Sequence, residues 1–235
     1  MAFVVAGRQE VTGAHPHELH GSWHGHGRLV LIRHGQSEGN VAQQLDTRPP
    51  GSALTDLGRS QARAFAVNWP HPSRLLVHSV ALRAAQTAQI IGTELGLVPH
   101  ELHGIEEVQA GDLEGLADKE SHDRFDAIYQ RWLQGDLATT MPGGESGEQV
   151  LDRYLPALQK LRIRYLDEGA EQPGDVLVVS HGAAIRLVSS QLAGVEGGFA
   201  LDHPLSNTGA VILSPVSDSR WSCVHWGDYR PPLRE

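Results

Sequence analysis

Residues Leu29-Val30-Leu31-Ile32-Arg33-His34-Gly35 form an apolar run that ends abruptly in arginine, histidine and glycine. The four consecutive aliphatic residues predict a buried strand. At the end of a central strand in an α/β sheet, side chains emerge into the crevice where ligands bind. The pattern therefore indicates either an anion-binding crevice around Arg33 and His34 or a strand end with two solvated polar residues.

Strand and helix patterns alternate from Arg28 onward, which is typical of α/β proteins with a mostly parallel sheet. Apolar runs predict strands at residues 29–32, 74–79, 98–102, 175–180, 210–213 and 221–225. Periodicity and capping residues predict helices over residues 55–68, 81–95 and 183–192, and two helices within residues 116–168 that are separated at residues 141–144. The chain is therefore expected to fold as an α/β protein.

The first 27 residues differ in composition from the rest of the chain. Within them stand five closely spaced histidines, mixed with glycine: His15, His17, His20, His24 and His26. Histidine-rich tracts can bind metals, but no cysteine or carboxylate stands at the spacing of a structural site. We therefore expect residues 1–27 to be a poorly ordered extension. Residues 28–235 are expected to form one domain, in which residues 116–168 are a helical insertion that caps the sheet.

Composition sets broad limits on the function. The chain has 235 residues, a formal net charge of −9 and one cysteine, Cys223. No stretch approaches the roughly 18 apolar residues that span a membrane, and the single cysteine fits a reducing cytoplasm. The negative charge argues against binding to nucleic acid or to a membrane surface. We expect a soluble cytoplasmic protein, in which a local arginine cluster can still hold an anionic small molecule.

Polar residues follow three of the predicted strands. Because the carboxyl ends of parallel strands share one edge, we expect Arg33, His34, Arg83 and His181 to converge there. Two guanidinium groups suit a phosphate, to which each can donate paired hydrogen bonds, and the helix N-terminus at Gly182 adds backbone N–H donors. A metal site is disfavoured, because zinc needs several protein ligands and the arginines would repel a cation.

The same residues lie in segments that resemble the histidine phosphatase superfamily, the phosphoglycerate mutase-like group. The resemblance covers about residues 28–215 and rests on residues 33–40 (RHGQSEGN), 54–62, 79–88, 107–115, 144–146 and 179–182. Two positions depart from the family pattern: Val80 stands where proline is usual, and Leu113 replaces a common tryptophan. The resemblance implies a three-layer sandwich with a mostly parallel central sheet.

The resemblance also implies a role for each residue at the strand ends. His34 would be the nucleophile that forms a phosphohistidine, since a neutral imidazole can attack phosphorus. Arg33, Arg83 and His181 would hold the phosphoryl oxygens and neutralise their charge.

Three further residues enter the site through the resemblance. Glu107 would protonate the leaving oxygen and then take a proton from water. The adjacent Glu106 is the alternative, and the spacing to Gly111 favours Glu107. Asn40 would hydrogen-bond the phosphate, and Gly182 would bind it at the helix N-terminus.

It is harder to predict which reaction of the family this chain catalyses. Phosphoglycerate mutases of this family carry paired arginines after the region of the acidic residue, and none stand between residues 115 and 143. That segment is acidic, which suits a phosphatase better than a protein that binds a doubly anionic phosphoacid. We expect a phosphatase that acts on a small phosphorylated metabolite without cofactor or metal. The alternatives are a phosphoglycerate mutase and a noncatalytic protein that binds phosphorylated ligands, and a homodimer through an edge strand is compatible with each.

Overall fold

The computed structural model describes residues 27–167, 174–216 and 220–231. Apart from Gly27, the predicted histidine-rich extension lies outside these residues. The strands are β1 (Leu29–Arg33), β2 (Ser73–His78), β3 (Pro99–Glu101), β4 (Asp175–Ser180), β5 (Ala210–Pro215) and β6 (Trp221–Trp226). The helices are α1 (Glu38–Val41), α2 (Asp56–Asn68), α3 (Leu82–Leu95), the 3-10 turn η1 (Gly111–Leu113), α4 (Lys119–Leu133), α5 (Gly147–Tyr165), α6 (Gly182–Ala193) and α7 (Gly197–Asp202).

The described strands form one sheet in the order β3-β2-β4-β1-β5-β6. The strands β3, β2, β4 and β1 run parallel, and β5 and β6 are added antiparallel. The prediction of a mostly parallel sheet is therefore confirmed. The register places Arg33 of β1 opposite Ser180 of β4, and Val179 of β4 opposite His78 of β2. The carboxyl ends of these three strands consequently lie at the same edge of the sheet.

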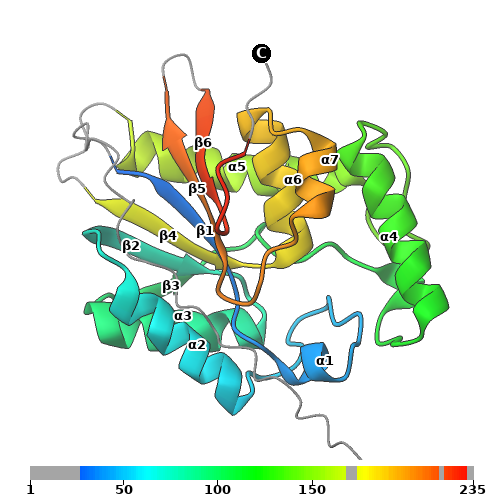
Figure 1. Cartoon of the computed structure of the whole chain (residues 1–235), viewed down its shortest axis with the longest axis horizontal. Coiled ribbons are helices and arrows are strands. Elements are labelled where there is room, and N and C mark those ends of the chain that lie inside the picture. The colour runs from blue at the N-terminus through cyan, green and yellow to red at the C-terminus, as the bar shows by residue number, and fades with distance from the viewer. Residues whose placement is uncertain (1–26, 168–173, 217–219, 232–235) are drawn as a thin grey trace, which may run out of the picture.

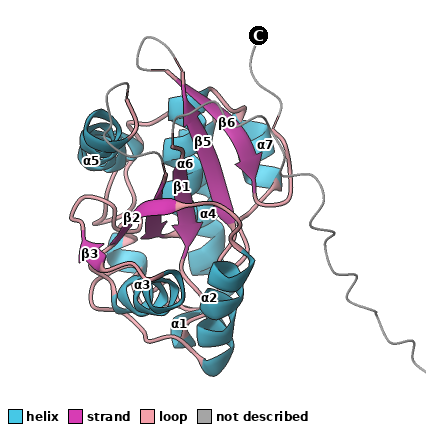
Figure 2. Ribbon diagram, turned by 90° about the vertical axis from the view of Figure 1, so that its left-hand side faces the viewer, coloured by secondary structure: helices cyan, strands magenta, loops and turns pink. Residues whose placement is uncertain are grey.

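Helices cover both faces of the sheet, which gives three layers (Figure 1). In β1, Leu29 and Leu31 belong to the core beneath α5 and α6, whereas Val30 and Ile32 belong to the core beneath α2 and α3. In Figure 2, α2 and α3 lie together below the strands. A strand packed on both faces needs apolar residues at consecutive positions, which explains the uninterrupted run that opens this domain.

The segment 116–168, predicted to cap the sheet, contains α4 and α5. Helix α5 packs on the sheet, where the hydroxyl of Tyr154 donates to Oγ of Ser180 at 2.8 Å. Helix α4 stands at the side of the molecule beside α6 and α7 (Figure 1). There the hydroxyl of Tyr129 donates to the carbonyl of Ala183 at 2.7 Å, so α4 is tied to the first turn of α6.

The helix boundaries follow from local sequence signals. Thr55 caps α2 by accepting a hydrogen bond from the amide of Gly58 at 3.0 Å. Helix α5 begins with a capping box between Ser146 and Gln149. Helix α3 ends at Gly96, whose φ of 68° lies in the left-handed region. The predicted helix starts and stops at these places are confirmed.

Glycine is required where the chain leaves β1. A Cβ at Gly35 would lie 2.4 Å from the carbonyl oxygen of Gly58, because the backbone after His34 runs directly against the first turn of α2.

The three short helical elements, α1, η1 and α7, were not among the expected helices. Each has too few residues to show an apolar stripe of helical period. None of the helices among the described residues is both long enough and apolar enough to cross a membrane.

Candidate active site

A pocket opens at the carboxyl edge of the sheet, between the ends of the parallel strands and α4. Six of the seven residues that the sequence suggested for the site lie on its walls: Arg33, His34, Asn40, Arg83, Glu107 and Gly182. The seventh, His181, lies directly behind Arg83. The structure therefore brings together residues that are up to about 150 positions apart in the chain, as expected from the shared sheet edge.

His34 follows β1 and is buried. Its Nδ1 lies 2.7 Å from the carbonyl oxygen of Gly35, and Nε of Arg83 donates to its Nε2 at 3.0 Å. A carbonyl only accepts and a guanidinium only donates, so Nδ1 carries the proton and Nε2 presents its lone pair. Burial, together with Arg83 and Arg33, lowers the pKa of His34 well below its ordinary value. The ring is thus a neutral imidazole whose Nε2 can act as a nucleophile.

Two arginines flank this ring with unused hydrogen-bond donors. Nε of Arg33 and Nη1 of Arg83 are buried, and neither has a hydrogen-bond partner among the described residues. Arg33 is oriented by the carbonyl of Leu205, to which its Nη1 donates at 2.6 Å. Nη1 of Arg83 forms an ion pair with a carboxylate oxygen of Asp46 at 3.5 Å, which partly balances its charge without a hydrogen bond. Buried donors without partners are rare in proteins, and here they are suited to binding the oxygens of an anion.

His181 is the N-cap residue of α6 and is fully buried. Nη2 of Arg83 donates to its Nδ1 at 3.2 Å, so the proton is on Nε2, which donates to Oγ of Ser79 at 2.9 Å. Burial, Arg83 and His34 lower the pKa of His181 well below its ordinary value. The ring centroids of His34 and His181 are 5.3 Å apart. The role that the resemblance implies for His181, holding phosphoryl oxygens, stays a prediction; in the structure both ring nitrogens are engaged, and His181 contacts the guanidinium of Arg83 from outside the pocket wall.

Glu107, and not Glu106, lies on the pocket wall. Its Oε1 accepts hydrogen bonds from the amides of Ala184 and Val108, both at 2.9 Å, and its Oε2 accepts one from Ala183 at 3.2 Å. The carboxylate therefore caps the N-terminus of α6. Glu106 faces away, toward Arg153 at 3.5 Å.

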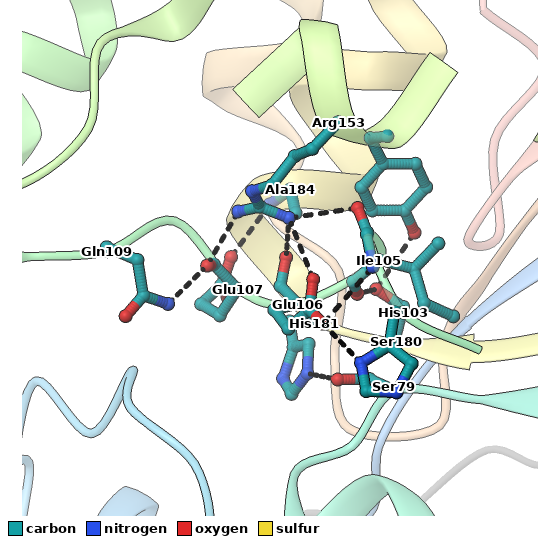
Figure 3. Close-up of polar contacts among 12 residues, drawn as sticks. Ser79, His103, Ile105, Glu106, Glu107, Gln109, Arg153, Ser180, His181 and Ala184 are labelled. Atoms are coloured by element: carbon teal, nitrogen blue, oxygen red, sulfur yellow. Dashed lines mark hydrogen bonds and ion pairs between the residues drawn. The ribbon is translucent and has the colours of Figure 1, made fainter. Parts of the chain in front are cut away.

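Figure 3 shows the network that holds the Glu107 loop, centred on Arg153 of α5. Nη2 of Arg153 donates to the carbonyl of Glu107 at 2.9 Å, and Nη1 donates to the carbonyls of Gly104 and Glu106. Glu145 pairs with the same guanidinium at 2.7 Å. Sequence reasoning missed Arg153, although a signal existed: it stands three residues after the buried Val150, on the apolar face of α5.

Asn40 and Gly182 complete the predicted set. The Oδ1 of Asn40, a residue of the pocket wall, accepts hydrogen bonds from the amide of Ser37 and from Nδ2 of Asn207, both at 3.1 Å, and its own Nδ2 has no hydrogen bond in the described residues. Asn207, which the sequence did not single out, also donates to the carbonyl of His34. A Cβ at Gly182 would lie 3.3 Å from Nε of Arg33, so the glycine leaves room for that side chain.

The acidic residues of the segment 116–145 do not reach the pocket. This group is exposed and absent from the pocket wall: Asp118, Glu120, Asp123, Asp126 and Asp136. The segment contributes Phe125 instead, and a third arginine, Arg186 of α6, lies on the wall. The acidic segment therefore places none of these five charges on the pocket wall.

Residues 29–229 match the family model of the histidine phosphatase superfamily (branch 1). A glucosyl-3-phosphoglycerate phosphatase of Mycobacterium tuberculosis (strain ATCC 25618 / H37Rv) is 34% identical over 211 residues, covering 85% of this chain and 86% of that protein. The PE-PGRS family protein PE_PGRS11 of the same organism is 28% identical over 86% of this chain, which spans 37% of that protein's length. A solved structure of a mycobacterial glucosyl-3-phosphoglycerate phosphatase with VO3 has a TM-score of 0.72 at 29% identity, covering 86% of this chain and 99% of that one.

Proposed function

The chain belongs to the histidine phosphatase superfamily, and from this premise we propose that it hydrolyses small phosphomonoesters through a phosphohistidine formed on His34. One observation carries the proposal: the unprotonated Nε2 of His34 lies against Arg83, and Nε of Arg33 and Nη1 of Arg83 are buried without a hydrogen-bond partner in the described residues. A phosphoryl group supplies the acceptors that these donors lack.

The first step transfers the phosphoryl group to the enzyme. Phosphoryl oxygens accept hydrogen bonds from Nε of Arg33 and Nη1 of Arg83, and Arg83 then releases the lone pair of His34. Nε2 attacks phosphorus, the N–P bond forms, and the P–O bond to the leaving group breaks. The protonated form of Glu107 gives its proton to the leaving oxygen. His181 acts as a positioning residue, because it holds Arg83 from behind.

The second step returns the enzyme to its starting state. Glu107 takes a proton from water, the water oxygen attacks phosphorus, and the N–P bond breaks to release inorganic phosphate. The two arginines stabilise the charge on the phosphoryl oxygens in both steps. Asn40 adds a neutral donor from its free Nδ2.

Release of phosphate from 4-nitrophenyl phosphate tests this function. Wild-type protein should hydrolyse the ester, and His34→Ala should abolish turnover. Binding of phosphate esters without turnover would identify a noncatalytic protein instead. Isomerisation of 3-phosphoglycerate that depends on a bisphosphorylated primer, with no release of phosphate, would identify a mutase.

We also propose that catalysis needs no metal, because the centre of the site carries guanidinium groups where a metal enzyme would carry a cation. Activity should survive dialysis against EDTA, and loss that added divalent metal restores would contradict this. A cytoplasmic location and a homodimer through an edge strand remain predictions from the sequence; in the described sheet the edge strands are β3 and β6. Gel filtration with light scattering tests the second of them.

A further inference from the structure

Arg186 lies on the wall of the same pocket, one helical turn after Gly182 in α6. Long side chains in a helix point back toward its N-terminus, and the contacts of Arg186 show this direction. Its Nε donates to the carbonyl of Gly182 at 3.3 Å, and its Nη1 donates to the carbonyl of Ala200 at 3.0 Å. The guanidinium therefore returns to the end of α6 that Glu107 caps.

The charge of Arg186 has no carboxylate partner. No ion pair within 4.0 Å joins it to any of the described residues, and its polar contacts there are two neutral carbonyls. The carbon of its guanidinium lies 4.9 Å from the ring centroid of Tyr129, a cation–π contact. Its Nη2 makes no hydrogen bond in the described part of the chain and is not buried. A guanidinium on the pocket wall thus keeps one nitrogen without a hydrogen bond among the described residues.

Arg186 is separate from the phosphoryl-binding pair yet within its electrostatic reach. Burial lowers the pKa of Arg33; Glu107 opposes this effect, and Arg186 adds to it. Phe125, Pro204 and Leu205 add apolar surface to the wall of this pocket. Besides Arg33 and Arg83, the pocket wall carries one further cation, Arg186, while its two carboxylates are engaged elsewhere: Asp46 pairs with Arg83 and Glu107 caps α6.

We propose that Arg186 binds a carboxylate on the leaving group of the substrate, so that the enzyme prefers phosphate esters of hydroxy acids to esters of neutral alcohols. The inference rests on the proposed function and specifies its substrate class. A carboxylate fits better than a second phosphate, because one free guanidinium nitrogen matches a singly charged group. A purely structural role for Arg186, joining α6 to α7, would affect all phosphate esters alike.

A matched pair of substrates separates these roles. 3-Phosphoglycerate and glycerol 3-phosphate differ in carrying a carboxylate or a hydroxymethyl group, and phosphate release measures kcat/KM for each. We expect wild-type protein to prefer the acid by about tenfold or more, the size expected for a hydrogen bond to a charged group. In Arg186→Met the ratio of the two kcat/KM values should fall to about one, and in Arg186→Lys it should be intermediate. Because both substrates are measured on the same sample, the ratio does not depend on how much of a variant is folded.

Arg63→Gln is the matched control. Arg63 is an exposed arginine of α2 paired with Glu94, outside the pocket, so its loss changes the net charge equally and should leave the ratio unchanged. Equal kcat/KM values in wild type, an unchanged ratio in Arg186→Met, or hydrolysis of 4-nitrophenyl phosphate without hydrolysis of the acid would each overturn the inference while leaving the phosphatase activity intact. Absence of phosphate release from every ester would overturn the proposed function, and the inference with it.

Discussion

The ring of His34 takes its reactive form from two neighbours that each have one hydrogen-bonding role. The carbonyl of Gly35 can only accept, and Nε of Arg83 can only donate, so the proton is confined to Nδ1. Burial and the two adjacent arginines then oppose a second proton. A histidine in this environment stays neutral, and therefore nucleophilic, under conditions acidic enough to charge an exposed histidine.

This environment predicts the titration of His34. Its protonation midpoint, followed by NMR of the ring Cε1–H, should lie below the ordinary value of about 6.5. Arg83→Gln removes a neighbouring cation, so the midpoint should rise, and kcat/KM should fall by about 100-fold or more with the loss of a phosphoryl donor. A midpoint near the ordinary value in wild type, or one that Arg83→Gln leaves in place, would refute this account of the ring.

Individual site residues were predictable to different degrees. Arg33, His34 and His181 stand beside buried strands, so the alternation of strands and helices was enough to bring them to one edge. Arg153 and Asn207 act through contacts with carbonyls and side chains from distant segments. The place of Arg153 on the apolar face of its helix marks it as unusual, but neither residue carries a local pattern that specifies its partners, which only the folded chain reveals.

At the scale of elements, the N-terminus of α6 holds the acid–base residue of the site in place. Glu107 accepts the amide hydrogens of Ala183 and Ala184, so one carboxylate both caps the helix and faces the pocket. Arg153 of α5 holds the loop that carries it. The acid–base group is thus positioned by two helices and not by a free loop.

Glu107→Gln should separate the two roles of this carboxylate. The variant cannot give a proton to the leaving oxygen, so kcat for an alkyl ester should fall by about 100-fold or more. 4-Nitrophenolate leaves without a proton, so hydrolysis of 4-nitrophenyl phosphate should fall much less. Loss of part of the helix cap should also cost about 1 kcal/mol of stability, measurable by urea unfolding. Equal losses on both substrates would argue against a role in proton transfer.

Long elements were predictable, and short ones were not. The helices α2, α3, α5 and α6 carry apolar periodicity and recognisable caps, and both hydrophobic faces of β1 appear as one apolar run. Helix α1 extends for four residues and is held by the capping box of Ser37 and Asn40. The antiparallel addition of β5 and β6 was likewise not predictable, since strand direction is set by packing against β1 and not by the residues of the strand.

At the scale of the whole molecule, the site makes folding sensitive to acid. His34 and His181 are buried without charge, and the pKa of each is lower in the folded chain than in the unfolded one. As the pH falls below about 6.5, these two histidines bind protons in the unfolded chain but not in the folded chain. The stability present above that pH is therefore lost as the pH falls.

Urea unfolding at about pH 7.5 and about pH 5.5 tests this linkage. Each ring should contribute a loss of about 1.4 kcal/mol of unfolding free energy per pH unit below its unfolded-state pKa. The double variant His34→Gln, His181→Gln should lose correspondingly less stability between the two conditions, because the carboxylates and remaining histidines are common to both proteins. The same pH dependence in wild type and double variant would show that these rings are not buried in neutral form.

The most direct measurement for the whole account is the capture of the phosphorylated enzyme. Wild-type protein is mixed with a radiolabelled phosphomonoester, quenched within one turnover in alkaline denaturant, and digested for mass spectrometry. We predict a phosphoryl group that is stable in base, labile in acid and located on His34, and no label in His34→Ala. Label on another residue, or hydrolysis by His34→Ala at the wild-type rate, would contradict it.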